Sequence, residues 1–140
     1  MSYTSPPVQA SGDLITAATW NSNFSYLYDS GWIAFSVPGY TNSWVNNGGP
    51  ASGATAAGYR KIGNVVRLGG TIKTGSFGNA FVTLPGGFRP NVQASIACVT
   101  TTNAIDAVQL TVTNLGVCTC IHVSGTGTIP SLDGATFTID

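Results

Sequence analysis

The sequence predicts a mainly β fold, an antiparallel β-sandwich of jelly-roll type with a short N-terminal helix. Short apolar runs alternate with polar residues at a period of two, and Gly, Pro and Asn turns separate them. Residues that favour helix are scarce, because the chain has no Glu and 7% charged residues, against about 25% in ordinary domains. With 140 residues, 43% of them hydrophobic, the chain is long enough for one domain with its own core.

The N-terminal part differs from the rest of the chain. Residues 1–12 are rich in Ser, Pro and Gly and predict an extended arm, and residues 13–29 carry the single helical pattern. Its apolar positions recur at spacings of three, four and three: Ala17, Trp20, Phe24 and Leu27. Because so short a helix is marginal alone in water, this stripe must pack on its own domain or on copies of the chain. We therefore expect an arm with an assembly helix over residues 1–30 and a sandwich domain over residues 31–140.

Eight strands are expected after residue 31, and several turns between them have a clear residue signature. Gly63 and Asn64 predict a tight hairpin, and Asp133 and Gly134 predict a turn in which Gly134 takes a positive φ. The long segment 38–58 is expected to be loop with at most one short strand. The expected strands are 32–37, 57–62, 64–73, 80–84, 92–100, 107–113, 116–124 and 135–139.

The hairpin of residues 107–124 has one aliphatic face and one face of intermediate polarity. Hydrophobicity places Val117, Ile121 and Val123 in the sandwich core. The opposite face carries Cys118, Cys120 and His122, which are neither charged nor strongly apolar. Such side chains suit a contact between subunits, so this face is expected on or near a subunit interface.

Few residues could support catalysis or bind a metal. The chain has one His, no Glu and no nucleophile motif of the type G-x-S-x-G, so we expect no enzymatic activity and no catalytic residues. Cys118, Cys120 and His122 have the spacing of three ligands on one strand face. A flat strand cannot wrap an ion alone, however, and Cys is more often a small buried residue. We expect no metal, no cofactor and, with an odd number of three cysteines, no disulfide framework.

Charge and hydropathy exclude other partners. Five dispersed Lys and Arg do not form the basic patch that broad electrostatic binding to nucleic acid requires. No apolar run approaches the roughly 20 residues of a membrane span, so no membrane insertion is expected. The N-terminus has no signal-peptide pattern. A surface with so little charge gives little repulsion between copies, which favours an oligomer.

Four phrases occur along the chain in a fixed order: SGDLITAATWN at 11–21, YRKIGNVVRLGG at 59–70, FVTLPGGFRP at 81–90 and SLDGATF at 131–137. In order and approximate spacing they resemble phrases of the C-terminal domains of bacteriophage tail-fibre and receptor-binding proteins. The resemblance covers residues 11–140. It implies a homotrimeric, non-enzymatic β-sandwich in the virion, made in the host bacterial cytoplasm, which contacts other virion proteins and attaches to a host receptor. Since the chain is short for a fibre protein, a head fibre or capsid decoration protein is the alternative.

Exposed aromatic and amide side chains are the candidates for binding a host-surface glycan, because aromatic rings stack on sugars and amides bond their hydroxyls. Tyr40 and Trp44 flank the Asn-rich loop, and Asn103 and Asp106 form a second candidate rim. Trp44 could equally pack under its own loop, and turn formation explains Asn103 and Asp106 equally well. An enzyme that degrades polysaccharide is disfavoured, because glycoside hydrolysis normally uses an Asp/Glu pair and the chain is poor in carboxylates.

Overall fold

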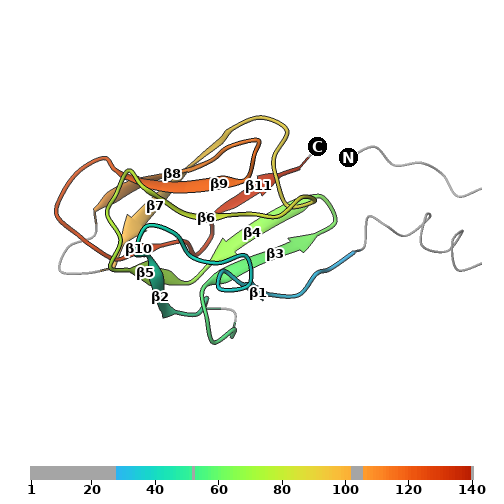
Figure 1. The fold of residues 1–140 in the computed structure, drawn as a ribbon, viewed down its shortest axis with the longest axis horizontal. Coiled ribbons are helices and arrows are strands. Elements are labelled where there is room, and N and C mark those ends of the chain that lie inside the picture. Colours follow the sequence, from blue (N-terminus) through green and yellow to red (C-terminus); the bar gives the residue numbers. More distant parts are fainter. Residues whose placement is uncertain (1–27, 52, 102–105, 140) are drawn as a thin grey trace, which may run out of the picture.

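Two antiparallel sheets form the domain (Figure 1). The computed structural model describes residues 28–51, 53–101 and 106–139. The smaller sheet has the strand order β1-β3-β4-β11, and the larger has the order β2-β5-β10-β7-β8-β9-β6. The strands are β1 (Ile33–Ala34), β2 (Val45–Gly48), β3 (Gly58–Ile62), β4 (Val65–Gly69), β5 (Thr71–Lys73), β6 (Ala80–Thr83), β7 (Ala94–Thr100), β8 (Ala107–Val112), β9 (Val117–His122), β10 (Pro130–Ser131) and β11 (Thr136–Thr138).

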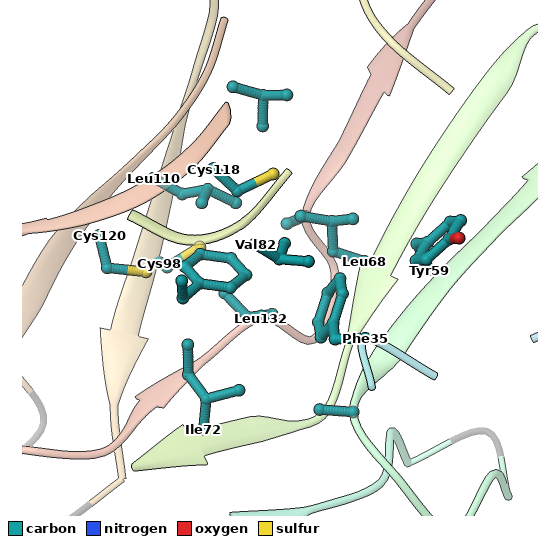
Figure 2. Close-up of a cluster of buried hydrophobic side chains, with 14 of the residues drawn as sticks. Phe35, Tyr59, Leu68, Ile72, Val82, Cys98, Leu110, Cys118, Cys120 and Leu132 are labelled. Carbon is teal, nitrogen blue, oxygen red and sulfur yellow. The ribbon is translucent and has the colours of Figure 1, made fainter. Parts of the chain in front are cut away.

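The antiparallel sandwich that the sequence predicts is confirmed. Side chains from both sheets meet between them in one apolar core (Figure 2). The described residues form one sheet of four strands and one of seven, whereas a jelly roll has eight strands in total. Of the predicted helical segment 13–29, the part with Ala17, Trp20, Phe24 and Leu27 lies outside the described residues. Its last two residues, Tyr28 and Asp29, are not helical, and Asp29 forms an isolated antiparallel bridge with Ile62. Residues 28–30 instead run beside β3: the Ser30 amide donates to the Lys61 carbonyl at 2.9 Å.

One predicted strand, residues 64–73, is in fact two strands in different sheets. The Gly63-Asn64 turn forms as expected, and Ile62 pairs with Val65 across it. The chain then leaves the small sheet at Gly70, where φ is +89°, and continues as β5 in the large sheet. A Cβ at Gly70 would lie 2.6 Å from the Cα of Ala57, so the crossover depends on glycine both for its backbone angle and for space.

Aromatic rings fill the core near the small sheet. The Phe35 ring lies 5.9 Å from that of Tyr59 and 5.5 Å from that of Phe81, between centroids. Phe35 follows β1, which is shorter than the predicted strand, and Val37 lies exposed in the turn beyond it. Arg89 donates to the Leu84 carbonyl at 2.7 Å, so it bonds the backbone at the end of β6.

The expected faces of β9 are reversed. Leu110 pairs with Cys120 in the β8–β9 register, so Cys120 shares the core face with Leu110. Cys118 and Cys120 are 0% exposed, whereas Ile121 and Val123 are 40% and 65% exposed. The prediction was therefore wrong. The register comes from the turn, in which the Thr113 amide bonds the Val117 carbonyl at 3.0 Å, and not from the hydrophobicity of the second arm.

Candidate functional site

Trp44 belongs to the core and cannot stack on a ligand. Its side chain is 1% exposed, and its Nε1 donates to the Asn79 carbonyl at 3.2 Å. Its ring meets the edge of Phe77 at 5.7 Å, and the absence of a side chain at Gly75 makes room for the indole. The prediction of a receptor-binding Trp44 is therefore wrong. Trp44 is a packing residue, as the alternative proposed, but its ring packs against the segment of residues 75–81 and not under its own loop.

Tyr40 is also turned toward the interior. Its ring meets Phe35 edge-on at 6.1 Å, and its hydroxyl is buried without a hydrogen-bond partner among the described residues. This burial raises the pKa of Tyr40 to about 12. Since neither its ring face nor its hydroxyl is freely presented, Tyr40 is a poor platform for a sugar. Tyr59 is also a packing residue, 2% exposed, with its ring against that of Phe88.

Asp106 holds a loop in place. Its Oδ2 accepts hydrogen bonds from the amides of Thr126, at 2.8 Å, and Gly127. Its own amide donates to the Thr100 hydroxyl at 3.1 Å. The turn-forming interpretation of Asp106 is therefore the one that the structure supports, and Asn103 lies outside the described residues.

The three residues expected at a subunit contact do not form a surface. Cys118 and Cys120 are free thiols inside the protomer, and burial raises the pKa of both well above the ordinary range. His122 is half-buried, with its ring stacked on Phe77 at 3.8 Å between centroids. Within the described ranges, no group of three or more His, Cys, Asp or Glu side chains could hold a metal ion. Nor does this part of the chain contain a helix long and apolar enough to cross a membrane.

A groove beside the small sheet is a concave feature of the described residues. Its volume is about 370 Å³. Four segments that are distant in sequence meet there: the residue before β1, the loop after β2, strand β4 and the turn that leads into β11. The lining residues are Trp32, Pro50, Ala51, Arg67, Leu68, Asp133, Gly134 and Thr136.

Gly69 forms the point on which these segments converge. A Cβ at this position would lie 2.6 Å from the Cβ of Pro50, 2.9 Å from the Cη2 of Trp32 and 3.3 Å from the Oδ1 of Asp133. The same Asp133 oxygen accepts a hydrogen bond from the Gly70 amide at 2.8 Å. Because Gly69 has no side chain, the Trp32 ring, Pro50 and the Asp133 carboxylate lie close to one another above its backbone.

Two arginines lie side by side near the groove, and only one of them is paired with a carboxylate. Arg60 pairs with Arg67 in the β3–β4 register. Arg60 is bound by the Asp29 carboxylate, with its Nε at 2.9 Å, and this bond lowers the pKa of Asp29 to about 2. Arg67 is exposed and has no ion pair with any carboxylate in the described part of the chain, so its guanidinium is available to the groove.

Sequence reasoning did not single out Trp32 or Arg67. In the sequence, Trp32 is one apolar residue at the start of a predicted strand, and Arg67 is one polar residue on the outer face of a hairpin. No local signal marks either residue as part of a site. The half-buried Trp32 also has an Nε1 that is buried and without a hydrogen-bond partner among the described residues.

Comparison with known proteins gives a likeness of fold. No family model matches the chain, and no curated protein matches it. Among solved structures, the crystal structure of the receptor binding protein (gp15) of Listeria phage PSA is similar, with a TM-score of 0.59 and 15% sequence identity. The similarity covers 88% of this chain and 73% of that chain. The chain therefore has a fold that a bacteriophage receptor binding protein also adopts.

Proposed function

We propose that the chain is a non-enzymatic bacteriophage virion protein, a fibre or tail-tip domain that attaches the particle to a saccharide receptor on the host cell surface. The observation that carries this proposal is the likeness of fold to gp15 over 88% of the chain. The four phrases in the sequence, found in the order typical of phage receptor-binding domains, support it independently. The partners are other copies of the chain, other virion proteins and the host glycan.

A homotrimer is part of this proposal, and the outer face of the large sheet supports it. Cross-strand pairs place the outward side chains of β7, β8 and β9 in one surface. None of them is charged, and Val99 and Ile121 are 44% and 40% exposed. We name this surface the β7–β9 outer face: Ser95, Ala97, Val99, Ala107, Gln109, Thr111, Thr119, Ile121 and Val123. Depletion of charge is typical of the core of an interface. The same uncharged face of a second copy would cover the β7–β9 outer face without burying an ion.

The lack of enzymatic activity is supported by the state of the carboxylates. Asp29 is paired with Arg60, Asp106 bonds loop amides, and Asp133 bonds the Gly70 amide. Each of these three carboxylates has a structural partner, whereas glycoside hydrolysis normally needs two carboxyl groups that flank the scissile bond.

The alternative is a head fibre or capsid decoration protein with a purely structural role. A binding assay separates the two functions. Fluorescently labelled full-length protein is incubated with a panel of bacterial strains that includes the host of the phage. Saturable binding to host cells, lost after periodate oxidation of the cell-surface sugars and retained after protease treatment, is the expected result. Absence of binding to every host strain, together with antibody labelling of the phage head in electron micrographs, would establish the structural role instead.

A further inference from the structure

We infer that the groove between Trp32 and Asp133 binds an uncharged sugar ring, with Trp32 as the stacking platform and Asp133 and Arg67 as the groups that bond its hydroxyls. This inference rests on the proposed attachment to a saccharide, and it assigns that binding to a specific surface. The residues involved are different from the aromatic and amide residues that the sequence predicts for this role.

The apolar part of the groove suits one face of a sugar. Trp32 is half-buried and lines the groove, and its Cη2 lies close to the position that a Gly69 Cβ would occupy. Pro50 and Ala51 lie on the same wall. An aromatic ring held in this way loses little conformational freedom when a ligand stacks on it, and the C–H face of a pyranose provides the matching apolar surface.

The polar part of the groove supplies both kinds of hydrogen-bonding group. Asp133 uses Oδ1 for the Gly70 amide, and its Oδ2 has no protein donor among the described residues, so this oxygen is free to accept from a hydroxyl. Arg67 is an exposed donor without an ion-pair partner in the same part of the chain. A sugar hydroxyl donates and accepts at once, so it matches a site that pairs a carboxylate with a guanidinium.

The balance of charge favours a neutral sugar over an anionic polymer. Arg67 and Asp133 contribute one positive and one negative charge to the lining. A phosphate or uronate group placed near Arg67 would also face the Asp133 carboxylate, and like charges at close range repel. The neighbouring cation, Arg60, cannot compensate, because Asp29 already binds it.

The size of the groove limits the ligand. A volume of about 370 Å³ lies at the lower end of the range of about 300–1,000 Å³ that small-molecule sites occupy. We therefore expect the groove to hold a terminal sugar or a short branch rather than the repeating backbone of a long polymer.

Saturation-transfer difference NMR on the full chain tests the inference. The probes are glucose, galactose, rhamnose and N-acetylglucosamine, with glucuronic acid and glucose 6-phosphate as anionic counterparts. Trp32→Ala and Arg67→Ala should weaken binding of a neutral sugar by about tenfold or more, the loss typical of truncating a central contact residue. Two matched variants outside the groove should bind as the wild type does. Arg60→Ala removes the neighbouring guanidinium, and Tyr28→Ala removes an aromatic side chain that is 53% exposed.

The outcomes separate this inference from the proposed function. If wild-type protein attaches to cells but Trp32→Ala and Arg67→Ala attach equally well, the groove assignment is wrong and attachment stands. Binding restricted to the anionic probes would refute the neutral ligand. If wild-type protein attaches to no cells, the proposed function fails, whatever the NMR signals show. Thermal unfolding of each variant identifies any loss that is due to misfolding, and Arg67→Ala, an exposed position, remains informative if Trp32→Ala does not fold.

Discussion

The carboxylate of Asp133 accepts a hydrogen bond from the backbone amide of Gly70 at 2.8 Å, although the two residues are 63 positions apart. The Leu132 amide donates to the carbonyl of the same glycine at 2.8 Å. Both backbone groups of Gly70 are therefore bonded to the segment that leads into β11. This is the point at which the chain passes from the small sheet to the large one, so a single turn fixes the crossover and one wall of the groove.

Removing this carboxylate should destabilise the domain. Asp133→Ala leaves the buried Gly70 amide without its acceptor, which costs about 1–3 kcal/mol of unfolding free energy. Asp133→Asn keeps a side-chain oxygen at the same position, so its loss should be smaller. Urea denaturation followed by circular dichroism measures both. Equal stabilities for the wild type and Asp133→Ala would contradict the role of this bond.

Gly70→Ala and Gly134→Ala should separate backbone strain from steric overlap. Both glycines have a positive φ, +89° and +83°. A Cβ at Gly134 would meet no atom within 4 Å, whereas one at Gly70 would overlap Ala57. We expect Gly134→Ala to cost about 1–2 kcal/mol from strain alone, and Gly70→Ala to cost clearly more or prevent folding. Similar denaturation midpoints for the two variants would show that Ala57 gives way easily.

Neighbouring residues on β9 should respond in opposite ways to a charge. Cys120→Asp places a carboxylate in a position that is fully buried, and it should unfold the domain. Ile121→Asp places the same charge on the outer face and should leave the fold intact. Circular dichroism and thermal unfolding give a direct comparison. If Cys120→Asp folds and Ile121→Asp does not, then Ile121 and not Cys120 faces the core, as hydrophobicity alone predicts.

Stability should fall at alkaline pH because of the buried thiols. Burial raises the pKa of Cys98 from 9.0 to about 11, and it raises those of Cys118 and Cys120 further. Each thiol is a weaker acid in the folded state, so its contribution is full below pH 9 and is lost as the pH rises through the folded value. Denaturation midpoints measured from pH 8 to pH 11 should decline above pH 9. In Cys98→Ala the decline should be shallower, and an unchanged slope would rule out Cys98 as a cause.

The β7–β9 outer face should control assembly. Light scattering of the wild type should give about three times the chain mass if the proposed homotrimer forms. Val99→Arg and Ile121→Arg place charges on the face and should reduce this mass. Val92→Arg is the matched control, because Val92 is 77% exposed and lies outside the face. A trimer that survives both substitutions would place the subunit contact elsewhere on the chain.

Local chemistry made much of the strand pattern predictable. The Gly63-Asn64 hairpin forms with Ile62 opposite Val65, and Gly134 has the positive φ that its turn requires. Phe137 in β11 and Ile139 just beyond it are two residues apart, and both pack on the core. These features depend on residues within a few positions of one another, whose dihedral preferences and period-two spacing are written in the sequence.

Contacts between distant segments decided the rest. A strand offers two faces, and a shift of register by one residue exchanges them, so the side chains of Cys120 and Ile121 could be assigned only from the pairing of β9 with β8. Trp44 is buried because Gly75, on another segment, leaves room for its ring. The groove exists because Trp32 and Asp133 converge over Gly69. No stretch of sequence contains these relations, since they arise when packing and loop closure bring separated residues to one place.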